Sequence, residues 1–293
     1  MHVVPIPGCV SFECGALMAA ATTGSLADLE AITFDFGNTL VPVPRGGLRR
    51  VVEDTARQIN IRCGPFDDVA LLAAWDEERE RQFAEEVPEF REVDLDQRLI
   101  RVLARMRGCP LPVPGVRWDD VAAAGYSDPA EVAWAVEVYS RAFVDLVPVP
   151  PDVGPMLERL SERYRLGVLS NWPLALTIDR FVEHAGWLPS LSAVIVSQRV
   201  GTIKPHPEIF RVAAELLGLP GEAIIHIGDD WAADIVGARE AGWHAAYLRE
   251  RVDSPLPSSE PDGRVEADLQ VDSLREFEEA LAGARTATPR LRR

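Results

Sequence analysis

Residues 223–248 read AIIHIGDDWAADIVGAREAGWHAAYL, and this stretch decides the fold. It begins with an apolar run, residues 223–228, that is typical of a buried strand and ends at two aspartates. Residues 232–241 carry apolar side chains at helical spacing, and residues 244–248 form a second apolar run. A strand, a helix and another strand in so short a segment predict a β-α-β unit with parallel strands.

The same alternation extends to both sides of this unit. The predicted order is helix 153–164, strand 166–170, helix 174–185, strand 193–197, helix 207–217, then the unit itself, and finally a weaker strand 268–272 and helix 273–282. Buried strands separated by helices of about 10–12 residues are typical of a parallel sheet that is covered on both faces. We therefore expect an α/β fold with a doubly wound parallel sheet.

One strand of this sheet lies far upstream. Residues 31–35 form an apolar run that ends at Asp35, and Gly37 and Asn38 follow as a tight turn. From residue 49 to residue 147 the spacing is helical throughout, and Asp128-Pro129 has the N-cap and first-turn proline of a helix start. These features predict an all-helical insertion between the first strand and the alternating part of the chain.

The pattern divides the chain into a core and an insertion. The α/β core comprises residues 29–44 and 148–285, and the helical insertion comprises residues 45–147. Residues 1–28 lack the basic start of a secretory signal. We therefore expect either a loose leader or a translation start assigned too far upstream, with Met18 as the true initiator. Residues 286–293 are expected to form a frayed tail.

Composition narrows the class of protein. Acidic residues outnumber basic ones by 46 to 30 among 293 residues, which gives a net charge of −16. Such a charge repels nucleic-acid phosphates and anionic lipids, so we expect neither as a partner, and no apolar run is long enough to span a bilayer. The cysteines show neither a disulfide framework nor metal-ligand spacing: Cys9, Cys14, Cys63 and Cys109. We expect a cytoplasmic protein, and the sequence carries no signal for its oligomeric state.

Polar residues gather where the predicted strands end. In doubly wound sheets ligands bind beyond the carboxyl ends of the strands. The residues at these ends are Asp35, Ser170, Asn171, Asp229 and Asp230, with Lys204 in a loop and Asp234 one turn into a helix. Lys204 is the only lysine among 30 basic residues, which indicates a position where arginine does not serve.

These residue types fit phosphoryl transfer. Clustered carboxylates repel one another unless a cation lies between them, and Asp35 and Asp229 offer the oxygen ligands that Mg²⁺ prefers. The metal would also reverse the local field for an anionic substrate. Asp35 could then act as the nucleophile, while Ser170 and Lys204 hold phosphoryl oxygens and Asp234 orients the lysine.

Four segments resemble, in order, the motifs of the haloacid dehalogenase-like hydrolase superfamily. They are residues 34–40 (FDFGNTL), 169–171 (LSN), 203–207 (IKPHP) and 227–238 (IGDDWAADIVGA). The last two continue into the longer patterns KPxPxIF at 204–210 and GDxxxxDxxGAxxAG at 228–242. The resemblance covers residues 30–40 and 150–283, and the helical insertion has the place and class of the superfamily's movable helical cap (C1 type).

The resemblance implies a Rossmann-like core and a Mg²⁺-dependent, phosphatase-type hydrolase that acts on a small phosphorylated metabolite through an aspartyl-phosphate. The implied metal ligands are Asp35, the backbone carbonyl of Gly37 and Asp229, with Asp234 as a further candidate. Asn171 joins Ser170 and Lys204 as an implied phosphate-binding residue.

One position departs from the superfamily's phosphatases. They carry a second aspartate two residues after the nucleophile, which protonates the leaving group and then activates water, and here that position is Gly37. Loss of a positioned acid/base lowers a rate by about 10²–10⁴-fold. We therefore expect weak or specialised turnover. A catalytically degenerate homologue that binds a phosphorylated ligand or a partner is the alternative, followed by a metal-free 2-haloacid dehalogenase.

Several residues also have structural interpretations. Ser170 could cap a helix, Asp234 could be a first-turn acid, and Asp230 could be an N-cap or support the site. We expect His206 in a loop and His226 in the core, with His206 as a possible substitute acid. The tryptophans of the insertion are expected in its core, and the arginines after the first motif on the surface: Trp75, Trp118, Trp134, Arg45, Arg49 and Arg50.

Overall fold

The predicted sheet is present in the computed structural model, which describes residues 25–249, 252–256, 259–261, 263 and 265–286. Within these residues six parallel strands pair in the order β3-β2-β1-β4-β5-β6. Their bounds are β1 Ala31–Phe34, β2 Arg165–Ser170, β3 Ala193–Val196, β4 Ile224–Gly228, β5 His244–Leu248 and β6 Leu269–Val271. The α/β fold class predicted from the sequence is confirmed.

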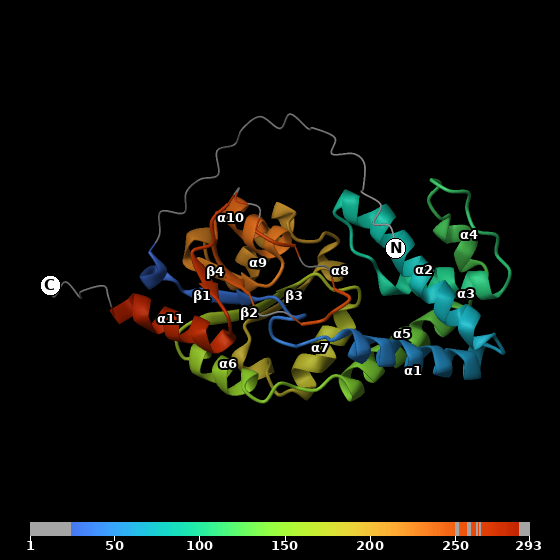
Figure 1. Ribbon diagram of the computed structural model, residues 1–293, viewed down its shortest axis with the longest axis horizontal. Coiled ribbons are helices and arrows are strands. Elements are labelled where there is room, and N and C mark those ends of the chain that lie inside the picture. The colour runs from blue at the N-terminus through green and yellow to red at the C-terminus, as the bar shows by residue number, and fades with distance from the viewer. Residues whose placement is uncertain (1–24, 250–251, 257–258, 262, 264, 287–293) are drawn as a thin grey trace.

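Helices cover both faces of the sheet (Figure 1). On one face lie α6 (Val153–Ser161), α7 (Ala175–His184) and α11 (Leu274–Thr286), and on the other α9 (Pro207–Leu217) and α10 (Gly237–Glu240), while α8 (Ser197–Val200) follows β3. Phe34 of β1 packs edge-on against Phe277 of α11 at 6.3 Å between ring centroids. On the opposite face Phe210 of α9 packs against Trp243 at 5.4 Å.

The helical insertion lies between β1 and β2 and extends to one end of the molecule (Figure 1). Its helices are α1 Arg45–Cys63, α2 Asp68–Glu86, α3 Leu95–Met106, α4 Asp120–Ala124 and α5 Pro129–Leu146. Asp67 and Asp94 cap α2 and α3, and Asp128 forms a capping box with Glu131 at the start of α5. The all-helical insertion predicted between the first strand and the alternating part of the chain is confirmed.

Aromatic residues fill the interior of the insertion. Trp75 stacks on Tyr139 at 6.1 Å, and Trp118 is also buried, as expected for core residues. Trp134 packs partly buried against this core, with the Arg62 guanidinium 4.5 Å from its ring. The assignment of residues 45–147 as a separate movable cap stays a prediction.

One predicted helix has a different form. Residues 232–241 were expected to form a single α-helix, but the structure has a π-helix, η5 (Trp231–Val236), followed by the short α10. At Gly237 a Cβ atom would lie 2.8 Å from the Phe210 ring and 2.9 Å from Pro205 Cα, so this turn packs directly against α9 and the loop before it. π-Turns of this kind are frequent at functional sites.

The chain ends fall largely outside the described residues. The predicted leader, with Met18, Cys9 and Cys14, lies there except for residues 25–28, in which Ser25 caps the 3-10 turn η1 (Leu26–Asp28). The predicted tail lies there from residue 287 onward. In the described part of the chain, no helix has both the length and the apolar run that a bilayer crossing requires.

Candidate active site

Strand order reverses between β1 and β4, and the candidate site lies at the carboxyl ends of these two neighbours. Asp35 follows β1 directly, and its backbone N–H donates to the Ile227 carbonyl of β4 at 2.9 Å. Asn38 then turns the chain with a φ of 60°, a conformation that asparagine tolerates, and its Oδ1 accepts from the Val43 N–H at 3.2 Å. The sheet and this turn together fix the position of the Asp35 carboxylate.

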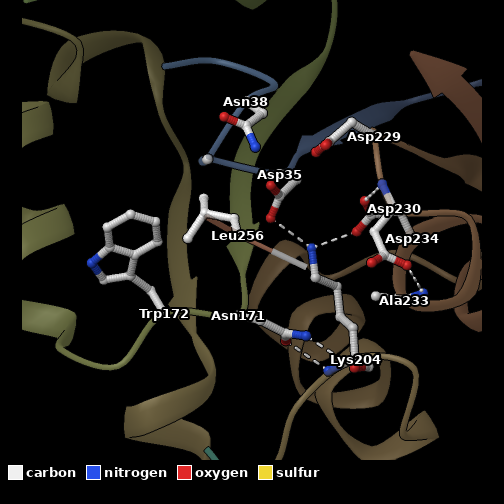
Figure 2. A pocket seen from close by; sticks show the side chains of 11 residues that line it. Asp35, Asn38, Asn171, Trp172, Lys204, Asp229, Asp230, Ala233, Asp234 and Leu256 are labelled. Carbon is white, nitrogen blue, oxygen red and sulfur yellow. Dashed lines mark hydrogen bonds and ion pairs between the residues drawn. The ribbon is translucent and has the colours of Figure 1, made fainter. Parts of the chain in front are cut away.

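Lys204 brings its ammonium group into the centre of the site (Figure 2). Nζ donates to Asp35 Oδ1 at 2.8 Å and to Asp234 Oδ1 at 2.7 Å. It also donates to the Leu169 carbonyl oxygen of β2 at 2.7 Å. Burial disfavours the charge, but Asp234 and Asp35 outweigh it and raise the pKa of Lys204 above its ordinary value. The lysine is therefore cationic at every physiological pH.

Asp234 holds the lysine from the first turn of the π-helix. Its Oδ2 accepts from the Asp230 N–H at 2.9 Å, and its Oδ1 lies 3.1 Å from His226 Nε2. Burial alone would raise the pKa of Asp234, but Lys204 and His226 bring it below its ordinary value. Gly228 makes this packing possible, because a Cβ atom there would lie 2.1 Å from Asp234 Oδ2.

Three carboxylates form a group that fits a metal ion. Asp35, Asp229 and Asp234 each place one oxygen so that all three lie within 4.8 Å of one another. Burial raises the pKa of Asp229 to about 8, with further contributions from Asp35 and Asp234. Burial likewise raises the pKa of Asp35 to about 6, against the opposing effect of Lys204. Asp35 and Asp229 therefore resist ionisation without a cation beside them, and a crowded set of oxygen donors suits a hard divalent ion such as Mg²⁺.

Ser170 and Asn171 occupy the end of β2, and phosphate binding by these two residues stays a prediction. Ser170 is buried and does not line the small cavity at Asp35, and its Oγ has no hydrogen-bond partner among the described residues. The helix-cap interpretation of Ser170 is wrong, because α7 starts only after Leu174. The Asn171 amide accepts from the Lys204 N–H at 2.7 Å and donates to the Lys204 carbonyl at 2.9 Å. This side chain therefore holds the lysine loop.

The place of the missing acid is filled by apolar side chains that the sequence did not indicate. A Cβ atom at Gly37 would lie 2.7 Å from Leu256 Cδ1 and 3.1 Å from Trp172 Cζ3. Trp172 follows β2, whereas Leu256 arrives from the long loop after β5, where Arg79 of α2 donates to the neighbouring Pro255 carbonyl at 2.7 Å. Only tertiary structure brings Leu256 to the first motif (Figure 2).

The remaining candidates have structural roles. Asp230 caps the π-helix, with Oδ1 accepting from the Ala233 N–H at 2.9 Å and from Ser259 Oγ at 2.6 Å. His226 is fully buried beneath Lys204, and burial followed by Lys204 lowers its pKa. His206 caps α9 and stacks near Phe90, and it lines neither cavity described below.

The arginines after the first motif are on the surface, as expected. Arg49 forms ion pairs with Glu53 at 2.9 Å and Asp76 at 3.0 Å, and Arg45 lies 3.7 Å from Asp253. Arg50 is exposed.

Two adjoining cavities open at the site. The smaller, of about 100 Å³, is lined by Asp35, Gly37, Asn38, Asn171, Trp172, Lys204, Asp229, Asp230, Ala233, Asp234 and Leu256. The larger, of about 340 Å³, shares the Asn171, Trp172, Lys204 and Leu256 walls and continues between the core and the helical insertion. A ligand with one group at Asp35 therefore has room to extend toward the insertion.

Comparison with known proteins agrees with this geometry. The family model of haloacid dehalogenase-like hydrolases matches residues 29–242. A glyceraldehyde 3-phosphate phosphatase from Methanopyrus kandleri is 27% identical over 257 residues, which are 85% of this chain and 95% of the relative. A pyrimidine 5'-nucleotidase from Escherichia coli is 27% identical over 150 residues, which are 50% of this chain and 62% of the relative.

Solved structures share the fold. A 2-haloacid dehalogenase from Pseudomonas syringae pv. Tomato has a TM-score of 0.59 at 23% identity, covering 87% of this chain and 99% of that chain. A phosphatase of the same family from Thermococcus onnurineus has a TM-score of 0.54 at 20% identity, covering 88% of this chain and 100% of that chain. At these identities the likeness concerns the fold and not the reaction.

Proposed function

The chain belongs to the haloacid dehalogenase-like hydrolase family, and from that premise we propose that it hydrolyses a small phosphate monoester with Mg²⁺, using Asp35 as the nucleophile. One observation carries the proposal: the Asp35 carboxylate lies beside a buried ammonium group and two further carboxylates at the switch point of the sheet. The curated relatives described above include phosphatases, which supports the same reaction class.

In the proposed reaction Asp35 attacks phosphorus, the bond from phosphorus to the ester oxygen breaks, and the phosphoryl group is transferred to the carboxylate. Water then hydrolyses this acyl phosphate and restores Asp35. Mg²⁺, held by Asp35, Asp229 and the Gly37 carbonyl, would neutralise charge on the phosphoryl group. Asp234 borders the same place and is a further candidate ligand.

Lys204 would bind a phosphoryl oxygen. Its ammonium already touches Asp35 at 2.8 Å, so a phosphoryl group arriving at that carboxylate meets a fixed positive charge. Asp234 and the Leu169 carbonyl hold the ammonium, and the Asn171 amide holds the lysine backbone. The buried Ser170 hydroxyl, which has no partner among the described residues, remains a candidate second donor.

Residue 37 cannot supply the proton that the leaving alcohol needs, so this proton must come from another source. Gly37 carries no acid, and Leu256 and Trp172 occupy the adjoining space. The hydrolase should therefore favour esters whose alcohols leave readily as anions, since general acid catalysis contributes about 10²–10⁴-fold for poor leaving groups.

The test uses an activated ester. Purified protein should release 4-nitrophenol from 4-nitrophenyl phosphate with Mg²⁺ and stop when EDTA is added. Asp35→Asn should abolish the activity and keep a cooperative thermal transition, whereas Asp179→Asn, an exposed acid on α7 paired with Arg199, should retain it. Activity that persists in EDTA contradicts the proposal, and halide release from a 2-halo acid in EDTA would favour the dehalogenase instead.

A second function follows from the apolar contacts at Gly37. A protein that captures a phosphorylated ligand without turning it over needs the metal and Lys204 but no acid/base. Mg²⁺-dependent thermal stabilisation by vanadate, together with no turnover across a broad panel of phosphate esters, would favour this binding protein over the enzyme.

A further inference from the structure

The larger cavity has a wall formed by residues to which the proposed phosphoryl transfer assigns no role. Most of its lining is apolar or aromatic: Leu48, Phe83, Val87, Phe90, Val93, Tyr139, Trp172, Pro173, Ile203, Pro205, Ala232, Ala233 and Leu256. Two arginines of the helical insertion, Arg79 and Arg98, interrupt this surface. Guanidinium groups in an apolar cavity next to a candidate phosphate site need an explanation, because their desolvation is costly.

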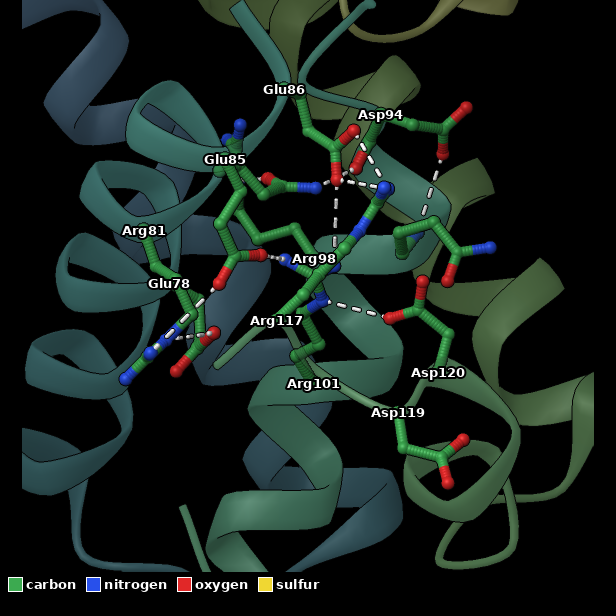
Figure 3. Close-up of polar contacts among 12 residues, drawn as sticks. Glu78, Arg81, Glu85, Glu86, Asp94, Arg98, Arg101, Arg117, Asp119 and Asp120 are labelled. Carbon is green, nitrogen blue, oxygen red and sulfur yellow. Dashed lines mark hydrogen bonds and ion pairs between the residues drawn. The ribbon is translucent and has the colours of Figure 1, made fainter. Parts of the chain in front are cut away.

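Two buried arginines of α3 differ in their partners (Figure 3). Arg101 forms ion pairs with Asp120 at 2.9 Å, with Glu85 at 3.2 Å and with Glu86 at 3.7 Å. Arg98, one turn earlier, is 5% exposed and forms no ion pair within the part of the chain that the structure describes. Its Nε donates to Gln82 Oε1 at 2.9 Å and its Nη2 to the Val93 carbonyl at 3.2 Å, and both acceptors are neutral.

The surroundings of Arg98 place no counter-ion in contact with its guanidinium group among the described residues. Burial, with a contribution from Arg79, lowers the pKa of Arg98 to about 10, which remains high enough to keep it charged. Glu92 also lines the cavity, but burial raises the pKa of Glu92, and its two oxygens already accept from the Val93 N–H and from Ser197 Oγ. Arg98 therefore lines this cavity with spare donors and forms no ion pair among the described residues.

We propose that the substrate carries a second anionic group in addition to its phosphate, and that Arg98 binds this group while the apolar walls hold the body between the two anions. This inference rests on the proposed function, since the phosphoryl group must occupy the smaller cavity. The ligand class is therefore a phosphate monoester of an apolar or aromatic alcohol that bears a carboxylate or a similar anion. A bound anion would supply Arg98 with the partner that Arg101 already has within the protein.

Three benzylphosphonates, which cannot be hydrolysed, test this inference. They carry a carboxymethyl, an ethyl or an aminoethyl group at the para position, and so share the phosphonate and the ring. Their affinities for the Mg²⁺-loaded wild-type protein are measured by calorimetry and by competition with 4-nitrophenyl phosphate. A charge-assisted contact predicts that the carboxymethyl compound binds about 10-fold or more tightly than the ethyl compound, and that the aminoethyl compound binds most weakly.

Variants assign the preference to one residue. Arg98→Met should equalise the carboxymethyl and ethyl compounds, and Arg98→Lys should retain part of the preference. Arg91→Met is the control, because Arg91 lies just before α3, is half-exposed and pairs with Glu86 outside this cavity. If Arg98→Met does not fold, Arg98→Lys makes the assignment, because Arg79 also lines the cavity. In that case an unreduced preference in a folded Arg98→Lys protein overturns the inference.

The outcomes separate the two proposals. Equal binding of the three compounds by a protein that hydrolyses 4-nitrophenyl phosphate overturns the Arg98 inference alone. A preference that survives in a folded Arg98→Met protein overturns it as well. No binding of any phosphonate together with no hydrolysis overturns the proposed function, and the inference falls with it.

Discussion

Asp229 has a carboxyl group whose pKa shifts far on folding. Its pKa rises from 3.8 to about 8 on folding, through burial and then through Asp35 and Asp234. Because the folded state binds this proton more tightly than the unfolded state, the associated stability is fully present below about pH 4 and is lost as the pH rises toward 8. Under the proposed function Mg²⁺ would replace the proton as the neutralising charge at Asp229, and its effect on the melting temperature would then grow over the same pH interval.

We therefore expect Mg²⁺ to raise the melting temperature more at pH 8 than at pH 5, and the EDTA-treated protein to lose stability between these values. Thermal melts at four pH values, with and without the metal, measure both effects. Asp229→Asn should flatten the difference between metal-free and metal-loaded melts. An equal Mg²⁺ effect at pH 5 and pH 8 would contradict the coupling.

A second prediction at the scale of single residues concerns restoring an acid at position 37. A single Gly37→Asp substitution brings its Cβ to 2.7 Å from Leu256 Cδ1, so the new carboxylate cannot settle without displacing that side chain. The double variant Gly37→Asp/Leu256→Ala provides the space. We expect the double variant to hydrolyse esters of poorly leaving alcohols faster than wild type, by up to about 10²-fold, and the single variant to gain much less.

Initial rates on phenyl phosphate and 4-nitrophenyl phosphate measure this gain, and Leu256→Ala alone is the control for the enlarged cavity. A restored acid should help phenyl phosphate more, because its alcohol is the poorer leaving group. No gain by the double variant on either ester would show that residue 37 does not limit turnover.

The sequence indicated part of the residue-scale arrangement. Asp35, Lys204, Asp229 and Asp234 converge as their positions at strand ends suggested, although their chemical roles stay predictions. The double hydrogen bond between Asn171 and the Lys204 backbone could not be predicted, because it depends on loop geometry. Leu256 lies more than two hundred residues from Gly37 in the chain, and nothing in its local sequence points to the site.

At the scale of elements, the starts of α5 and α6 offer a matched pair of substitutions. Asp128 caps α5 with a capping box, whereas Asp152 occupies the N-cap of α6 without any side-chain cap hydrogen bond. Asp128→Ala should lower the free energy of unfolding by about 1 kcal/mol, and Asp152→Ala by much less. Urea unfolding of both variants measures the difference, and equal losses would mean that the capping box does not stabilise α5.

Element boundaries were predictable where local chemistry marks them. Asp128-Pro129 predicted the start of α5, where Asp128 forms the cap and Pro129 is the first helical residue. The π-helix that carries Asp234 was missed, because helical spacing does not distinguish a π-turn from an α-turn. Gly237, which ends this π-helix, packs against Phe210 and Pro205, which are distant in sequence.

At the scale of the whole molecule, the negative net charge of the protein repels the proposed anionic substrate. The chain carries −16 at neutral pH, and phosphate monoesters are dianions there. Salt screens this repulsion, since the Debye length falls from about 30 Å at 0.01 M to about 8 Å at 0.15 M. With Mg²⁺ saturating at each salt concentration, KM should fall as sodium chloride rises over this range, while kcat stays constant.

Steady-state kinetics on 4-nitrophenyl phosphate give both constants. Mg²⁺ titrations at each salt concentration are the necessary control, because salt also weakens attraction of the metal. A KM that rises with salt at saturating Mg²⁺ would mean that local positive charge, and not the net charge, governs the approach of the substrate.

The architecture was the most predictable level. Alternating strands and helices indicated the parallel sheet, and the uninterrupted helical spacing indicated the insertion between β1 and β2. The family resemblance is confirmed by the match over residues 29–242. The cavity between core and insertion was beyond prediction, since it depends on how two separately patterned regions pack.

The loop after β5 is tied to the helical insertion at two points. The Pro255 carbonyl accepts from Arg79 of α2, and the Asp253 carbonyl accepts from the backbone N–H of Arg45, the first residue of α1. Leu256 is the next residue along that loop, and its tip rests at Gly37. If α2 moved away from the sheet, either the hydrogen bond from Arg79 to the Pro255 carbonyl would break or Leu256 would move away from Gly37. A displacement of the insertion would then also uncover the turn after Asp35.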